Sequence, residues 1–262
     1  MSTTTLVTGR STRILLMNPN SSSAMTDAMK KVIDDIDLPA STEVHTYTAP
    51  SDAPASIDNN DDMTASTKAV LRDFYNNGPH KIDGIVVACF SLHSLVGELP
   101  REWPNTAITG ILEASVAAAI PLLGAGQKWG IVTTGAYWEE HLAIAVRSVL
   151  GAGPRDANVK FAGVRSTGLN ASDFHHGIDP AVIREKLKAA TKSLLDVGNV
   201  AVIVMGCAGM VGLEDIIRET ACEKRGEEFA YSTLHVIDGV RAGIMQVDQM
   251  IKNRRLRPGW KW

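Results

Sequence analysis

The 262-residue chain is poor in cysteine and has almost no net charge, and each shortage excludes a class of protein. Three cysteines are too few, and odd in number, for a disulfide framework, so we expect free thiols in the cytosol. A net charge of −3 from interspersed charges supplies no basic surface for nucleic acid. No apolar run approaches the roughly 20 residues that span a bilayer. We therefore expect neither nucleic acid nor a membrane as a partner.

The sequence signatures of cofactors are also missing. Gly124-Ala125-Gly126 lacks the remaining spacing of a dinucleotide fingerprint, and no glycine-rich loop carries the lysine of a phosphate loop. His175-His176 has no second cluster of ligand type near it, so we predict no metal site. The sequence favours a protein that works without a cofactor.

Strands and helices alternate along the chain, which predicts an α/β fold with mostly parallel sheets. Residues 84–89 and 200–205 are continuously apolar and rich in β-branched side chains, as central strands covered on both faces are. The chain from 49 to 60 is longer than an ordinary connection and is predicted to be a binding loop. We expect further strands at 13–17, 43–48, 107–111, 129–133, 159–164 and 234–237, and helices at 25–36, 64–76, 113–123, 138–150, 180–197, 214–225 and 240–251.

The strand ends show an internal repeat. The spacing from Asn18 to Cys89 nearly equals the spacing from Thr133 to Cys207, and each of these residues lies at or just after the end of a predicted strand. This predicts two pseudo-symmetric lobes, each a mostly parallel sheet flanked by helices. Because open α/β sheets bind ligands at the carboxyl ends of their strands, the active site is expected in the cleft between the lobes.

Two opposed thiols suit the inversion of a carbon centre, since one group removes a proton from one face and the other returns one to the opposite face. A thiol at a helix N-terminus ionises more readily than a free thiol, so we expect Cys89 or Cys207 to supply a thiolate near neutral pH. A carbanion intermediate needs hydrogen-bond donors. Asn18, Asn20, Ser21, Thr133 and Thr134 are of the right types, although helix capping explains the same residues equally well.

Three further side chains have alternative interpretations. His93 either lies one helical turn from Cys89 and tunes its thiolate, or is a surface histidine. Cys222 lies in a charged helical stretch and is interpreted as structural. Trp138 is interpreted as packing on the surface of a lobe.

Seven segments, taken together and in this order, resemble the hydantoin racemase family of the aspartate/glutamate racemase superfamily, which includes allantoin racemases and fungal relatives. They cover about residues 13 to 253, and they read MNPNSSSAMT, APASIDNND, IVVACFS, ITGILEAS, WGIVTT, VIVMGCAGM and HVIDGVRAGI. The resemblance implies that Cys89 and Cys207 are the acid/base pair of a racemase. It also implies a substrate-binding set around them: Asn18, Ser91, Thr134, Gly206, Ala208 and Gly209. Phe90, which directly follows the first cysteine, is a further substrate-binding candidate.

By the same resemblance, the first lobe comprises residues 1–112 and 227–262 and carries Cys89, while residues 113–226 form the second lobe with Cys207. The implied substrate is a 5-substituted hydantoin or allantoin. Where the family tends to show an acidic residue and a proline turn, this chain reads Leu92-His93-Ser94-Leu95, which leaves the substrate open.

Two other functions remain open. One is an isomerase or decarboxylase that uses one cysteine as a nucleophile, as in the related maleate isomerase. The other is a metabolite-binding protein without turnover. We also expect a homo-oligomer, in which Trp260 and Trp262 dock against a neighbouring subunit or against the same chain.

Overall fold

The computed structural model describes residues 11–78, 81–153, 156, 158–174 and 177–256, and these form two four-stranded parallel sheets. The first sheet has the strand order β2-β1-β3-β4 and the second has the order β6-β5-β7-β8, so the second repeats the topology of the first. The strands are β1 (Thr12–Asn18), β2 (Thr42–Thr48), β3 (Gly84–Val87), β4 (Ala107–Gly110), β5 (Lys128–Thr133), β6 (Phe161–Ser166), β7 (Val200–Met205) and β8 (His235–Asp238). The predicted fold of two pseudo-symmetric α/β lobes is confirmed.

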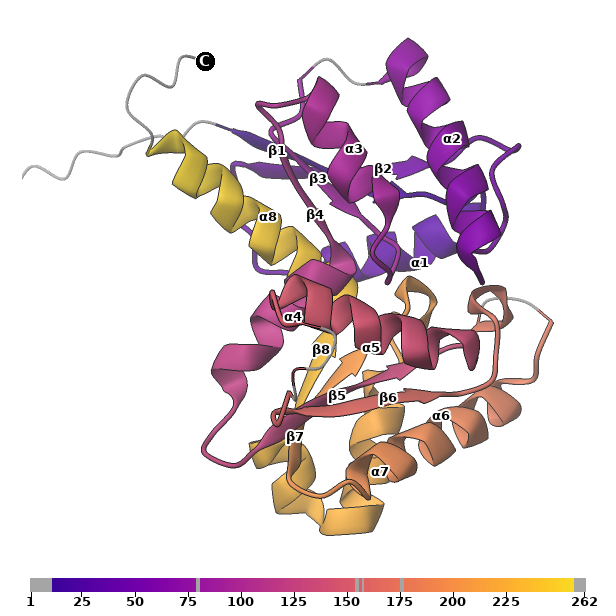
Figure 1. Cartoon of the computed structure of the whole chain (residues 1–262), viewed down its shortest axis with the longest axis vertical. Helices are drawn as coiled ribbons and strands as arrows, with labels where there is room; N and C mark the ends of the chain where they lie inside the picture. The colour runs from indigo at the N-terminus through magenta and orange to yellow at the C-terminus, as the bar shows by residue number, and fades with distance from the viewer. Residues whose placement is uncertain (1–10, 79–80, 154–155, 157, 175–176, 257–262) are drawn as a thin grey trace, which may run out of the picture.

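Helices cover both faces of the sheets, as Figure 1 shows. In the first lobe α2 and α3 lie on one face of the sheet and α8 lies on the other, while α4 and α5 lie between the two sheets. The helices are α1 (Ser23–Ile33), α2 (Asn60–Asn77), α3 (Ser94–Glu102), α4 (Ile111–Ala119), α5 (Tyr137–Val149), α6 (Pro180–Leu195), α7 (Glu214–Arg225) and α8 (Gly239–Arg255). Within the described residues, no helix has both the length and the apolar character needed to cross a membrane.

The alternation of side chains along β1 explains why this strand is central. Ile14 and Leu16 point into the core on the α8 side, whereas Leu15 and Met17 point into the core under α2 and α3. On the α8 side, Gly243 allows close contact, because a Cβ at this position would lie 2.5 Å from Cγ1 of Val86. The final helix is therefore tightly packed on the first sheet.

The chain passes between the lobes twice. It leaves the first sheet after β4 and enters α4, which packs against both α5 and α8. The return was expected near Glu227, but β8 pairs in parallel with β7, from His235 opposite Val202 to Asp238 opposite Met205. Since this strand belongs to the second sheet, we place the return after Asp238, at the start of α8.

Cys89 and Cys207 lie just beyond their strands rather than at the last strand residue. β3 ends at Val87 and β7 ends at Met205, so Cys89 and Cys207 each lie in the loop that follows. Helix α3 adds an element that the sequence analysis did not assign. The residues His175, His176, Trp260 and Trp262, used above to discuss a metal site and subunit docking, lie outside the described residues.

Candidate active site

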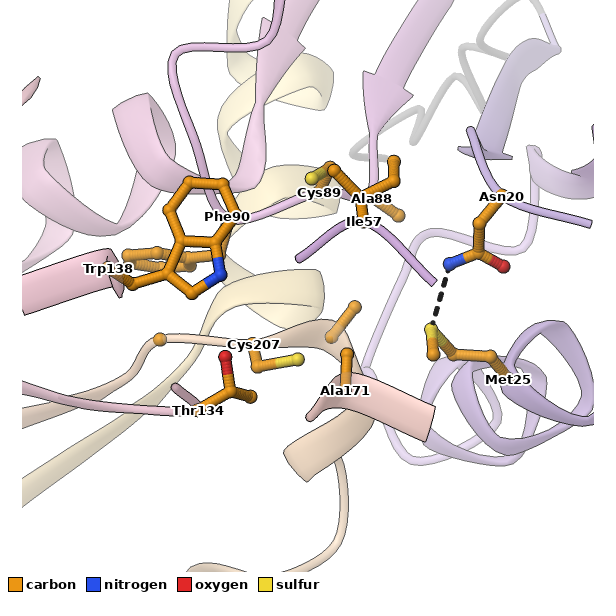
Figure 2. A pocket seen from close by; sticks show the side chains of 12 residues that line it. Asn20, Met25, Ile57, Ala88, Cys89, Phe90, Thr134, Trp138, Ala171 and Cys207 are labelled. Carbon is orange, nitrogen blue, oxygen red and sulfur yellow. Dashed lines mark hydrogen bonds between the residues drawn. The ribbon is translucent and has the colours of Figure 1, made fainter. Parts of the chain in front are cut away.

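One small pocket collects residues from the carboxyl edges of both sheets (Figure 2). Cys89 enters it from the first lobe and Cys207 enters from the opposite wall, on the second lobe. The cavity volume is about 30 Å³, which holds one or two water molecules and no organic ring. The lobes are thus closed on one another, and a substrate has to open the pocket in order to enter.

Seven of the twelve residues predicted for the site line this pocket. They are Asn20, Cys89, Phe90, Thr134, Gly206, Cys207 and Ala208. The other five, Asn18, Ser21, Ser91, Thr133 and Gly209, lie behind the lining and hold it in place.

The amide of Asn18 is fully buried and fixes the turn after β1. Its Nδ2 donates to Oδ1 of Asn20, to the carbonyl oxygen of Ser22 and to Oγ1 of Thr26, each at 3.0 Å. These bonds occupy the amide nitrogen of Asn18, and the one to Asn20 positions that residue at the pocket.

The side-chain Nδ2 group of Asn20 is available to donate a hydrogen bond to a ligand in the pocket. Oδ1 of Asn20 accepts hydrogen bonds from Asn18 and from the backbone N–H of Ser22, whereas Nδ2 contacts, among the residues that the structure describes, only the sulfur of Met25, at 3.1 Å. A thioether is a weak acceptor. The Nδ2 group can therefore exchange this contact for a carbonyl oxygen at little cost.

The loops that carry the cysteines are supported from behind. Oγ of Ser91 lies 3.3 Å from Sγ of Cys89, and the backbone N–H of Gly209 donates to Sγ of Cys207 at 3.2 Å. Oγ1 of Thr133 donates to the carbonyl oxygen of Gly206 at 2.8 Å. Thr133 thus holds the second cysteine loop, while its neighbour Thr134 lines the pocket.

Burial, rather than helix donors, dominates the acidity of both thiols. Burial raises the pKa of Cys89 to about 11, with the bond to Ser91 acting against it and the charges of Glu113 and Asp58 adding to it. Burial likewise raises the pKa of Cys207 to about 12, although the N–H of Gly209 opposes the rise. The expectation of a thiolate near neutral pH is therefore wrong for the closed protein, because desolvation outweighs one or two backbone donors.

His93 is neither at the surface nor bonded to Cys89. It is 2% exposed and caps α3, with its Nδ1 accepting from the backbone N–H of Leu95 at 3.3 Å. Its Nε2 lies 3.3 Å from Oγ of Ser66, which donates to the carbonyl oxygen of Pro19 at 2.6 Å. Burial lowers the pKa of His93 to about 4, so this neutral ring links α3 to the loop that carries Asn20.

A segment that we call the strap, residues 49–59, runs beside the pocket and is bonded to both lobes. Ser21 anchors it to the first lobe, through its N–H to the carbonyl oxygen of Pro54 and its Oγ to that of Ala53. At the far end, Oδ1 of Asp58 accepts from the backbone N–H of Ala171 in the second lobe at 3.4 Å. The long loop was predicted to bind a ligand, and its Ile57 does line the pocket.

Five lining residues were missed by the sequence analysis: Met25, Ile57, Ala88, Trp138 and Ala171. Trp138 was assigned to the surface of a lobe, but its side chain lies in the pocket wall beside Phe90 (Figure 2). Ile57 alone had a signal, because it belongs to the long loop. Among the residues that the structure describes, no group of three or more His, Cys, Asp or Glu side chains is placed to hold a metal ion.

Two parallel four-stranded sheets flanked by helices match the two-lobe α/β fold of the Asp/Glu racemases. The chain belongs to the Asp/Glu/hydantoin racemase family, whose model matches residues 14–247. The hydantoin racemase of Paenarthrobacter aurescens is 30% identical over 204 residues, which cover 76% of this chain and 79% of that protein. A Schizosaccharomyces pombe protein named only as uncharacterized protein C1F7.10 is 31% identical over 244 residues, 92% of each chain.

A solved structure shows the same architecture. The allantoin racemase from Klebsiella pneumoniae superposes with a TM-score of 0.74 at 24% identity, over 93% of this chain and 89% of that one. Family membership supports an isomerase that acts on a small molecule.

Proposed function

We propose that the protein is a cofactor-independent racemase of neutral cyclic ureides, namely 5-substituted hydantoins or allantoin. The observation that carries this proposal is the placement of one cysteine from each lobe on opposite walls of one pocket. The hydantoin racemases among its relatives support the ring chemistry.

The proposed reaction is a proton exchange at C5 of the ring. One cysteine, as thiolate, removes the C5 proton, and the electron pair moves into the adjacent carbonyl to give an enolate. The other cysteine, as thiol, then donates its proton to the opposite face of C5. The two thiols exchange protonation states in each turnover, so a substrate of opposite hand uses them in the reverse roles.

The charges around the pocket favour a neutral substrate. No charged side chain is among the described residues that line it, and the charges that act on the thiols are the carboxylates of Asp58 and Glu113. These carboxylates repel anions, and the pocket lining provides no cation to offset them. A dicarboxylate such as maleate is therefore a poorer fit than an uncharged ring.

The decisive experiment follows optical rotation and solvent-deuterium incorporation at C5 of hydantoins and allantoin. Wild type is expected to racemise at least one of them, and Cys89→Ser and Cys207→Ser each to lose about 1000-fold or more, because a serine hydroxyl is a far weaker acid than a thiol and so supplies almost no ionised base. Cys222→Ser is the matched control, because Cys222 is half-buried, packs against the core of the second lobe and does not line the pocket, so turnover is expected to stay unchanged.

Three outcomes would contradict the proposal. Absence of both racemisation and exchange with every ureide tested rejects it. A covalent adduct on one cysteine, seen by mass spectrometry, supports the nucleophilic alternative. Thermal stabilisation by a ureide without any exchange supports the binding protein.

A further inference from the structure

Trp138 is a pocket residue whose indole N–H has no hydrogen-bond partner among the described residues. It lies in the first turn of α5 and is 6% exposed. Tyr137 packs edge-on against its ring, with centroids 5.1 Å apart, and His141 does so at 6.4 Å. These contacts fix the plane of the indole. In Figure 2 the indole nitrogen lies on the ring edge that faces the middle of the pocket.

The indole N–H is a donor that cannot accept. Across the described part of the chain, no side chain or carbonyl oxygen accepts a hydrogen bond from this group. Trp129 also leaves its Nε1 without a partner, but it is enclosed in the core under Phe161, where no ligand can reach it. At Trp138, by contrast, the donor faces the cavity that a substrate would fill.

The proposed chemistry needs such a donor. The enolate carries a negative charge, and the fields of Asp58 and Glu113 oppose that charge as they oppose ionisation of the thiols. Since no cation lines the described pocket, neutral donors have to stabilise the oxygen. Asn20 supplies one Nδ2 group at one end, and Trp138 lies at the other end with the two cysteines between them (Figure 2).

We propose that Trp138 donates its indole N–H to a carbonyl oxygen of the substrate, opposite the amide of Asn20. This inference rests on the proposed function. The indole N–H of Trp138 and the amide of Asn20 would bind opposite edges of a flat ring, so the two faces of the ring stay accessible to Cys89 and Cys207. The geometry selects a ring that carries carbonyl oxygens over an apolar ring of the same size.

Two substitutions of Trp138 separate the effect of its N–H donor from the effect of its aromatic ring. Trp138→Phe keeps an aromatic ring and removes the N–H, and it is expected to lower kcat for C5 exchange about 100-fold, in the range of a lost oxyanion donor. Trp138→Tyr returns an O–H donor and is expected to recover part of that loss. Trp129→Phe is the matched control for replacing a tryptophan, and its turnover is expected to stay within threefold of wild type. If Trp138→Phe also stays within threefold, the proposal is overturned.

A second measurement, an NMR titration of the wild-type protein, reads the hydrogen bond directly and does not require turnover. Protein labelled with ¹⁵N at its five tryptophans is titrated with hydantoin itself, which has no substituent at C5. The indole resonance of Trp138, identified by its loss in Trp138→Tyr or by its contacts to Tyr137 protons, is expected to move downfield on binding. Binding of hydantoin that leaves this resonance unmoved overturns the proposal. A downfield shift without any C5 exchange rejects the racemase and leaves the donor role of Trp138 standing.

Discussion

The high pKa of the thiols makes the pH profile of the reaction a sharp test. With a pKa of about 11, Cys89 is ionised in about one molecule in 10⁴ at pH 7 and in about one in 10² at pH 9. Because kcat/KM reports the protonation of the free enzyme, it is expected to rise about 100-fold over this interval, tenfold for each pH unit. The rise comes from the thiolate and needs no change in structure.

The assay is deuterium incorporation at C5, measured by NMR at low substrate concentration. A hydantoin methylated on the nitrogen between its carbonyls stays neutral over this range, so the profile reports the enzyme alone. Exchange by hydroxide is subtracted with the Cys89→Ala, Cys207→Ala double variant. A profile that is already flat between pH 7 and pH 8 would refute the reasoning, since it would require a thiolate formed near neutral pH in spite of burial.

Two further predictions concern residues around the site. Asp58→Ala removes the acceptor for the Ala171 N–H and is expected to speed hydrogen exchange of that amide about 3- to 10-fold. Asp58→Asn keeps an acceptor and is expected to change the exchange rate little. Equal exchange rates in the two variants would mean that other contacts hold the strap. Burial, with the charge of Glu214, raises the pKa of Asp238 to about 6. The protonated carboxyl therefore stabilises the folded protein below pH 4, and this stabilisation is lost as the pH rises through about 6. Asp238→Asn keeps the cap on the N–H of Arg241 and should remove this dependence in urea unfolding at pH 4, 5 and 7, while Asp238→Ala, which also loses the cap, should be about 1 kcal/mol less stable than Asp238→Asn at all three; a dependence that persists in the Asn variant would assign it to another group.

The central strands were predictable because their residues are buried on both faces. Val200–Met205 is an uninterrupted apolar run and was placed at its observed bounds, as expected for a central parallel strand. Helix α3 was not assigned because it contains Gly97 and Pro100, which disfavour helix interiors. It forms because Leu95 and Leu99 are buried one turn apart and His93 caps it, and both facts depend on the tertiary fold.

The candidate site was predictable in position but not in detail. Thr133 and Thr134 were both predicted as site residues from their residue type. Adjacent residues of an extended chain point to opposite sides, so Thr134 lines the pocket while Thr133 bonds to the carbonyl oxygen of Gly206. The pKa of a thiol depends on how much water the other lobe removes, which local sequence does not encode. Trp138 reaches the pocket because α4 and α5 lie between the sheets, an arrangement set by contacts far apart in the chain.

The return of the chain through α8 has a consequence for the order in which the protein is made. The second sheet, from Lys128 to Asp238, is one continuous stretch, so it can assemble as soon as that stretch has been synthesised. The first sheet lacks its covering helix until residues 239–255 follow, because Val86 and Ile111 pack against Gly243. The half that is translated first is therefore expected to be completed last, and pulsed hydrogen exchange during refolding should protect β7 before β3.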